Sequence, residues 1–242
     1  MHKSKDQIRE HKRKNREMFN SIADKYDIIN HVLSGGVDFY WRWRALSKLS
    51  SIEDSLILDL AAGTGDFTLA ARRFSPRKVV GVDVALEMIK LGVDKVRNCN
   101  FDARFLGGDA ECLPFRSDTY DIVMAAFGVR NFGHIPTGLS EAFRVLRPGG
   151  QLIVLDFCEP TIPIVRDLYL LYFRRVLPFL GGLISRERQA YEYLPRSVSD
   201  FPQGGGFLDL MHEAGFIENS ATELTLGICS IYLGEKKSDF YT

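Results

Sequence analysis

The segment Leu56–Asp66 (LILDLAAGTGD) carries the residue types that bind a nucleotide-like ligand. The apolar residues 56–58 predict a strand that is buried on both faces of a parallel sheet, and Asp59 follows them. Gly63 and Gly65 then allow the backbone to turn sharply and to approach a ligand without side-chain clashes. Because the next residues predict a helix, the segment is typical of the first strand, turn and helix of a nucleotide-binding fold.

The glycine pattern distinguishes between classes of cofactor. A dinucleotide-binding loop requires G-x-G-x-x-G, but Thr68 occupies the third glycine position. Asp66 lies at the predicted start of the helix, where its carboxylate would repel a pyrophosphate. S-adenosylmethionine (SAM) has an adenosine, a sulfonium and an ammonium group, and it has no phosphate. We therefore expect this loop to bind SAM.

Acidic residues also stand at the ends of the predicted strands. Lys78–Val84 (KVVGVDV) predicts a second strand that contains Asp83, which lies 18 residues after Gly65. A carboxylate that binds ribose hydroxyls is expected about 20 residues after such a loop. This spacing, together with Asp59 at the first strand, favours a cofactor site. The alternative is that both acids only cap a turn or a helix.

Two further strand ends carry polar residues. Asp109 follows a third short strand and is placed to accept a hydrogen bond from an adenine amino group, with the Ala110 backbone beside it. The alternative for this acid is that it only caps the next turn. Tyr120–Phe127 predicts a fourth strand, after which Arg130 and Asn131 follow. Packing alone is a poor explanation for such a pair at the end of a central strand, so we expect the pair to serve a site.

The N-terminal residues predict a helical cap over the nucleotide-binding core. Residues 1–16 contain seven Lys/Arg and two acids, which indicates either a solvated helix or attraction to an anionic membrane surface. Residues 18–45 are rich in aromatic side chains, and Tyr26 and Asn30 lie on one face of a helix that residues 34–36 end. This segment packs on the domain, acts as a lid over a flat aromatic substrate, or does both.

Length and pattern predict one α/β domain. The chain has 242 residues, and its signals suggest a seven-strand pattern that finishes in a hairpin near Gly227. The segment after the fifth strand is too long for a simple connection, and it forms either a helix pair or an apolar channel for a long hydrophobic tail. We divide the chain into an N-terminal helical cap or lid (1–50), a SAM-binding core (51–157), an insertion for the substrate tail (158–202) and a C-terminal helix with strands (203–242).

Composition and charge exclude several functional classes. The formal net charge is zero, which gives no sign of nucleic acid as a main partner. The four cysteines are widely spaced and the five histidines do not cluster, so we expect neither a disulfide framework nor a metal site. We find no signal peptide and no apolar run that would span a bilayer. We therefore expect a cytoplasmic protein that contacts the membrane peripherally if its substrate is a lipid. The sequence is compatible with either a monomer or a homodimer.

Five segments of the chain resemble the UbiE/MenG family, the C-methyltransferases of ubiquinone and menaquinone biosynthesis. They are residues 18–36 (MFNSIADKYDIINHVLSGG), 58–68 (LDLAAGTGDFT), 108–115 (GDAECLPF), 127–132 (FGVRNF) and 141–157 (EAFRVLRPGGQLIVLDF). Many SAM methyltransferases share the glycine loop, whereas MFNSIADKYDIIN and FGVRN are much more specific. Residues 191–202 and 214–216 fit the same family, so the similarity covers the chain from about residue 18 onward.

The resemblance implies a fold, a reaction and a site. The fold would be an α/β, Rossmann-like class I SAM-dependent methyltransferase, with a mostly parallel seven-stranded sheet and helices on both faces. The reaction would be C-methylation of a prenylated quinol ring, with demethylmenaquinol as the preferred substrate and the benzoquinol precursor of ubiquinone as the alternative. The family positions for SAM are Thr64, Asp83, Asp109, Ala110 and Ala126, and those on the substrate side are Arg130, Asn131 and Tyr26. The family often has Glu where Asp156 stands.

A mechanism can be stated as a hypothesis. A ring carbon ortho to a phenolate is a good nucleophile, so we expect the permanently charged Arg130 to stabilise the phenolate, while Asn131 and Tyr26 orient the ring oxygens. The candidates for removal of the ring proton are His134, Asp27, His31 and a bound water. No metal is needed, because the sulfonium is already an activated leaving group. A methyltransferase for another small lipid or phenol, or a non-catalytic nucleoside-binding module, would share the cofactor motifs.

Overall fold

The structure is a computed structural model that describes residues 5–97, 99, 101–172 and 188–238. Seven strands form one sheet in the order β3-β2-β1-β4-β5-β7-β6. The strands are β1 (Leu56–Leu60), β2 (Lys78–Asp83), β3 (Ala103–Gly107), β4 (Tyr120–Ala126), β5 (Leu146–Phe157), β6 (Ile217–Leu224) and β7 (Cys229–Glu235). The pairs among β1 to β5 are parallel, whereas β7 is antiparallel to both β5 and β6. The predicted mostly parallel sheet and its C-terminal hairpin are confirmed.

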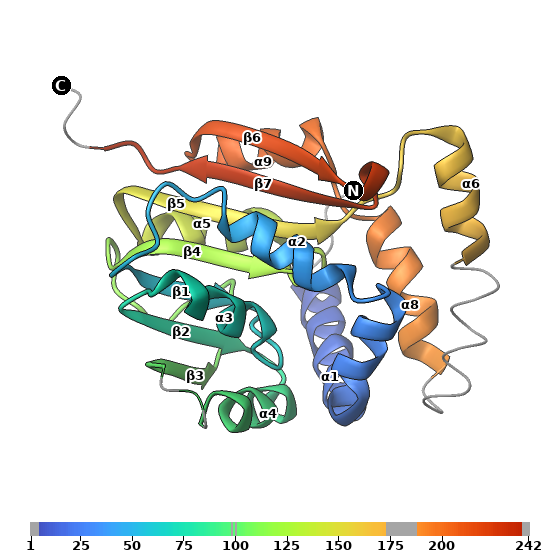
Figure 1. The fold of residues 1–242 in the computed structure, drawn as a ribbon, viewed down its shortest axis with the longest axis horizontal. Helices are drawn as coiled ribbons and strands as arrows, with labels where there is room; N and C mark the ends of the chain where they lie inside the picture. The colour runs from blue at the N-terminus through green and yellow to red at the C-terminus, as the bar shows by residue number, and fades with distance from the viewer. Residues whose placement is uncertain (1–4, 98, 100, 173–187, 239–242) are drawn as a thin grey trace.

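Helices cover both faces of this sheet, as predicted (Figure 1). They are α1 (Lys5–Leu33), α2 (Val37–Leu46), α3 (Asp66–Ala71), α4 (Leu86–Arg97), α5 (Ile135–Val145), α6 (Pro163–Leu171), α8 (Arg188–Ser199) and α9 (Gly205–Glu213). Figure 1 shows α2 and α3 in front of the sheet and α5 and α9 behind it. Helices α1 and α8 lie at the end toward which the parallel strands point (Figure 1), which is where ligands bind in this type of fold.

Two buried clusters explain why the helices take these positions. Trp41 of α2 and Phe67 of α3 belong to one cluster, whereas Leu139 of α5 and Phe207 of α9 belong to the other. The neighbouring residues Ile57 and Leu58 of β1 are both fully buried, but they join different clusters. Successive side chains of a strand point to opposite faces, so an uninterrupted apolar strand needs a helical layer on each side.

The glycine loop has the backbone shape that its sequence predicts. Gly63 and Gly65 have φ angles of +55° and +81°, a region that residues with a Cβ rarely adopt. A Cβ on Gly65 would also lie 2.8 Å from the Phe105 ring, which packs beneath the loop. Helix α3 begins directly after Gly65. The loop is therefore held tightly against the sheet while its ligand-facing side carries no bulky side chain.

Some predicted boundaries shift in the structure. Asp59 lies inside β1 instead of after it, so its side chain is buried in the sheet layer. Strand β5 begins at Leu146, ahead of the glycine turn at residues 149–150, because Leu146 pairs with Tyr120 of β4 and the turn pairs with Lys236. Helix α1 begins at Lys5, so the basic N-terminal segment is helical over most of its length.

The predicted insertion contributes α6 and α8, whereas residues 173–187, where much of the proposed apolar channel falls, lie outside the described residues. Among the helices that the structure describes, none combines the length and the apolar character needed to cross a bilayer.

Candidate functional site

A cavity lies at the carboxyl ends of the parallel strands, next to helix α1, and we call it the strand-end cavity. It contains about 730 Å³ of empty space, which includes the part that is open to solvent. Its lining includes most of the residues predicted to bind a cofactor or substrate, namely Gly63, Asp83, Asp109, Ala110, Ala126, Asn131 and Tyr26. The structure thus brings together residues at or after the carboxyl ends of four different strands, as a ligand site at the edge of an open α/β sheet requires.

Asp83 serves the glycine loop as well as the cavity. One carboxylate oxygen, Oδ2, accepts a hydrogen bond from the Gly63 N–H at 2.8 Å, and Oδ1 accepts one from the Ala85 N–H at 2.8 Å. Burial raises the pKa of this carboxyl group above its ordinary value, although these backbone donors act to lower it. The two explanations offered by the sequence, a turn cap and a ligand-binding acid, are therefore compatible for this residue.

Asp109 is also engaged by the chain itself. Its Oδ1 accepts from the Glu111 N–H at 2.9 Å, which is the turn-capping role. Its Oδ2 accepts from the Lys12 ammonium group at 2.7 Å, and Lys12 lies 2.8 Å from the Glu111 carboxylate as well. Lys12 belongs to α1, so this ion pair fastens the helix to the rim of the strand-end cavity.

A smaller cavity beside the glycine loop, which we call the loop cavity, contains about 340 Å³ of empty space, including the part that is open to solvent. It shares Tyr26 and Gly63 with the strand-end cavity, so the two spaces adjoin. Arg42 and Asp59 line this cavity, and each has one buried side-chain atom, Nε and Oδ1 respectively, without a hydrogen-bond partner among the described residues. Buried polar atoms are nearly always paired, so a free donor and a free acceptor here suit a ligand that carries both an anionic and a cationic group.

The environment of Asp59 makes its protonation sensitive to pH near neutrality. Burial is the main cause that raises the pKa of its carboxyl group to about 7, and the nearby Asp83 carboxylate raises it further. The Thr68 hydroxyl, which donates to Asp59 Oδ2 at 2.6 Å, and the Arg42 guanidinium act in the opposite direction. A cation bound beside Asp59 would favour the ionised carboxylate.

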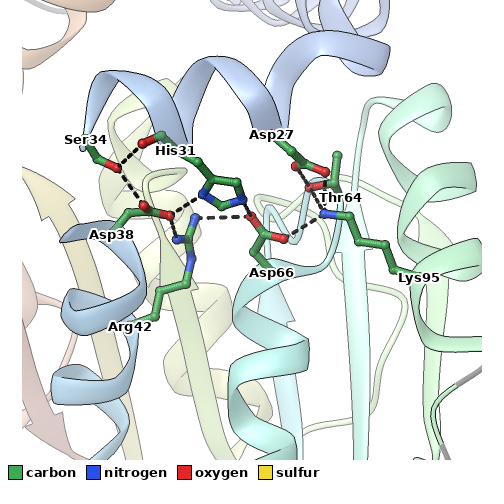
Figure 2. Close-up of polar contacts among 8 residues, drawn as sticks. All are labelled: Asp27, His31, Ser34, Asp38, Arg42, Thr64, Asp66 and Lys95. Atoms are coloured by element: carbon green, nitrogen blue, oxygen red, sulfur yellow. Dashed lines mark hydrogen bonds and ion pairs between the residues drawn. The ribbon is translucent and has the colours of Figure 1, made fainter. Parts of the chain in front are cut away.

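A network of charged residues joins α1 and α2 to the glycine loop (Figure 2). Thr64, a predicted SAM position, donates its hydroxyl to Asp27 of α1 at 2.5 Å. The Lys95 ammonium group of α4 lies 2.5 Å from Asp27 and 2.7 Å from Asp66. Thr64 is therefore buried against protein groups, and of the three cavities described here it lines the loop cavity.

The second half of this network lies around Asp38, at the start of α2 (Figure 2). His31 Nδ1 lies 2.8 Å from the Asp38 carboxylate, and Arg42 also binds that carboxylate. Asp66 links the two halves, because both His31 Nε2 and Arg42 Nη2 lie 3.6 Å from it. Three carboxylates thus face three basic side chains across the junction of the N-terminal helices and the core.

Arg130 does not line the strand-end cavity, although its neighbour Asn131 does. Its guanidinium forms a buried ion pair with Asp156 at 2.7 Å, with side chains 5% and 0% exposed. Burial acts to lower the pKa of Arg130, but Asp156 together with Tyr26 and Tyr193 raises the pKa above its ordinary value. Arg130 lines a wider space between α1, α8 and the chain after β4, which we call the outer cavity; it measures about 1690 Å³ including the part that is open to solvent. The outer and strand-end cavities share Asn15 in their linings.

The structure also separates the candidates for removal of a proton. Asp27 and His31 belong to the charged network of Figure 2 and are absent from the linings of the three cavities. His134 lines the outer cavity, and its Nδ1 lies 2.8 Å from the Thr137 hydroxyl.

Sequence reasoning missed four polar residues: Lys12, Asn15 and Tyr193 at the cavities, and Lys95 in the charged network. Lys12, Asn15, Phe19 and Tyr26 all line the strand-end cavity. Their spacing of three, four and seven residues places them on one face of a helix, and that periodicity was the available signal. Lys95 and Tyr193 carry no such signal, because their partners lie far away in the sequence.

Comparison with known proteins identifies the same family that the sequence segments resemble. The sequence profile described as the ubiE/COQ5 methyltransferase family matches residues 5–236. A ubiquinone/menaquinone biosynthesis C-methyltransferase UbiE from Geobacter sulfurreducens is 44% identical over 225 residues, which cover 91% of this chain and 88% of that protein. A demethylmenaquinone methyltransferase from Thermus thermophilus is 43% identical over 220 residues, which cover 90% of this chain and 100% of that protein.

Solved structures support the fold. A SAM-dependent methyltransferase from Thermotoga maritima superposes with a TM-score of 0.66 at 19% identity, covering 91% of this chain and 99% of that one. A methyltransferase from Methanococcus maripaludis superposes with a TM-score of 0.63 at 16% identity, covering 92% of this chain and 95% of that one. At these identities the likeness concerns the fold alone, and it matches the Rossmann-like class I methyltransferase fold expected from the sequence.

Proposed function

Because the chain belongs to the ubiE/COQ5 methyltransferase family, we propose that it transfers a methyl group from SAM to a ring carbon of a prenylated quinol. The observation that carries this proposal is the match over about nine-tenths of the chain to relatives named for quinone methylation. Demethylmenaquinol is our preferred substrate, since a relative that is matched over 100% of its own length is named for that reaction. The ubiquinol precursor is the alternative, because other relatives carry both pathways in their names.

The residues around the two inner cavities fit SAM. Asp83 is suited to ribose hydroxyls, and Asp109 with the Ala110 backbone is suited to the adenine edge. The unpaired Arg42 Nε and Asp59 Oδ1 match the carboxylate and the ammonium group of the methionine part. When bound, SAM supplies an electrophilic methyl group on a positively charged sulfur.

The quinol ring is assigned to the junction of the strand-end and outer cavities. Asn131 lines the first and Arg130 lines the second, so adjacent residues reach the ring from two sides. Arg130 provides positive charge for a phenolate oxygen, and Asn131 and Tyr26 orient the ring. Burial raises the pKa of Tyr26, which keeps its hydroxyl available as a donor. Among the three side chains considered for the ring proton, His134 is the one that lines a cavity.

Helices α1 and α2 act as the lid in this proposal. Lys12 fastens α1 to Asp109 and Glu111 at one end, and Asp27 fastens it to Thr64 and Lys95 further along. Both anchoring points lie at residues assigned to the cofactor. Closing the helix over the strand-end cavity would exclude water from the reaction, which strengthens every electrostatic interaction inside.

Peripheral contact with a membrane is part of the proposal, because a prenylated substrate resides in lipid. The apolar residues Ile164, Leu168 and Leu171 of α6 are 75%, 62% and 53% exposed. Exposed apolar side chains on an amphipathic helix are suited to the headgroup region of a bilayer. We expect the protein to sediment with anionic vesicles, and replacing these three residues by Ser should abolish that binding. Equal sedimentation of both proteins would remove membrane contact from the proposal.

The function is tested with purified protein, methyl-labelled SAM and chemically reduced quinols. We expect label in the ring of demethylmenaquinol, with the benzoquinol precursor assayed in parallel. A quinone profile of cells that lack the protein should show a species one methyl group short. If neither quinol is labelled while SAM binds, the chain is instead a methyltransferase for another lipid or phenol, or a nucleoside-binding module.

The pKa of Asp59 predicts how SAM affinity varies with pH. In the free protein the carboxyl group is protonated below about pH 7, and binding an ammonium group requires that this proton leaves. The affinity should therefore be constant above that pH and fall about tenfold for each unit below it. Calorimetry should show SAM binding more than about tenfold weaker at pH 5.5 than at pH 7.5. The Asp59→Asn protein should bind more weakly with no such pH dependence, and a dependence that persists there would assign it to another group.

A further inference from the structure

A hydrogen-bonded network connects α1, α8 and the loop after β4. The Tyr193 hydroxyl of α8 donates to Asn131 Oδ1 at 2.8 Å. Asn15 of α1 donates from Nδ2 to the Tyr193 oxygen at 3.1 Å and to the Asn131 backbone carbonyl at 3.1 Å. Asn15 also lies 3.2 Å from His11 Nε2. Three segments that are far apart in the sequence therefore meet at one side chain of the strand-end cavity.

The direction of these hydrogen bonds fixes the orientation of the Asn131 amide. The Asn131 backbone carbonyl can only accept, so Asn15 faces it and Tyr193 with its NH₂ group; the Tyr193 hydroxyl in turn donates its proton to Asn131 Oδ1. The Asn131 oxygen is thereby occupied. The Asn131 Nδ2 donates one long hydrogen bond of 3.4 Å to the Phe127 carbonyl. The second N–H of the same amide group is left for a ligand.

From this geometry we propose that Tyr193 and Asn15 are positioning residues that hold Asn131 with an N–H donor facing the substrate ring. The inference rests on the proposed function, since the ring oxygen is the group that Asn131 would meet. A donor is the correct partner for an oxygen that carries negative charge while the ring carbon is alkylated. A rotated amide would present its own oxygen to the phenolate and repel it.

Tyr193 is better suited to this role than to removing the ring proton. Burial raises the pKa of its phenol, outweighing the lowering effects of Arg130 and the Asn15 hydrogen bond. The hydroxyl therefore stays protonated at neutral pH. The proton is committed to Asn131 and the oxygen to Asn15, so Tyr193 acts through Asn131.

The test is a double-mutant cycle of Tyr193→Phe and Asn131→Ala, measured as quinol turnover at saturating SAM. We expect Tyr193→Phe to lower kcat about tenfold, in line with the loss of one orienting hydrogen bond, and to change the SAM affinity less than about twofold. In the Asn131→Ala background the same change should lower kcat by less than about twofold, because its target is gone. Tyr232→Phe is the matched control. This variant removes another buried hydroxyl, which accepts a 2.9 Å hydrogen bond from the Gly204 N–H. Tyr232 lines none of the three cavities, so its replacement should leave kcat unchanged.

A tenfold effect of Tyr193→Phe that persists in both backgrounds would overturn the proposal, as would no effect in either. A second readout does not depend on the substrate. The Asn131 side-chain NH₂ group, followed by NMR, should exchange with water faster in Tyr193→Phe than in the wild type and in Tyr232→Phe. Unchanged exchange would show that Tyr193 does not hold the amide. If the exchange changes but the wild type methylates no quinol, the positioning role stands and the proposed substrate fails.

Discussion

Removing the charge of Arg130 is expected to lower quinol turnover about 100-fold or more while SAM affinity stays within about threefold, because loss of one oxyanion-stabilising group typically has that cost. Arg130 lines the outer cavity, and the next residue, Asn131, lines the strand-end cavity. A phenolate gains most from a fixed positive charge in a site from which water is excluded. SAM binding should persist, since Arg130 does not line the strand-end cavity.

A variant that tests Arg130 must also remove the charge of its buried partner, Asp156. Replacing Arg130 alone would leave the fully buried Asp156 carboxylate without its partner, which commonly costs about 3–5 kcal/mol of stability. The double variant Arg130→Met with Asp156→Asn removes both charges together and is expected to fold. Its matched control is Arg144→Met with Glu141→Gln, which removes another arginine–carboxylate pair at 2.6 Å, away from the three cavities.

Turnover is compared at saturating SAM, and SAM affinity is measured by calorimetry. If the Arg130 double variant keeps turnover within about threefold of wild type, Arg130 does not stabilise the phenolate. Its ion pair with Asp156 would then be purely structural, a role that the buried contact also permits. A similar loss in the Arg144 control would attribute the effect to reduced stability.

The sheet could be predicted because short stretches of the sequence are enough to identify its strands and its first turn. Apolar runs such as residues 56–58 and 120–127 can be buried on both faces only in a covered sheet, and Gly63 and Gly65 mark the turn that the first strand requires. For the same reason the sequence located Asp83 and Asp109 at the cavity, since strand ends share one edge of a parallel sheet.

The pairing of the site residues was not predictable in this way. Arg130 and Asp156 are 26 residues apart, and nothing local shows that the carboxylate of β5 points at the guanidinium. Lys95 meets Asp27 only because α1 folds back over α4, which is a long-range consequence of helix packing. In the sequence, the charged residues of α1 and aspartates such as Asp27 and Asp66 are indistinguishable from solvent-exposed ones. The tertiary structure brings them together in the network of Figure 2.

Asp83→Asn is expected to weaken SAM binding by about 10- to 100-fold, which corresponds to the 1.5–3 kcal/mol typical of a hydrogen bond to a charged group. The carboxylate lines the strand-end cavity with two acceptor oxygens, whereas an amide has one oxygen and one donor. At saturating SAM, kcat should remain within about threefold, because ribose binding contributes equally to the ground state and the transition state.

The same substitution also affects the loop, and the two effects must be separated. The two carboxylate oxygens of Asp83 accept hydrogen bonds from the Gly63 and Ala85 N–H groups. In the Asn variant, the side-chain NH₂ group would face one of these N–H donors, and that hydrogen bond would be lost. The Asp83→Asn protein should therefore also lose some thermal stability. Asp94→Asn on α4, where the acid is exposed and pairs with Arg97, is the matched control and should change neither quantity.

Calorimetry gives the SAM affinity of each variant, and the melting temperature without SAM gives its stability. A variant that melts early but binds SAM with unchanged affinity would restrict Asp83 to holding the glycine loop. A fall in kcat at saturating SAM would instead place Asp83 at the reacting groups, because an interaction confined to the ribose is equally strong before and during methyl transfer.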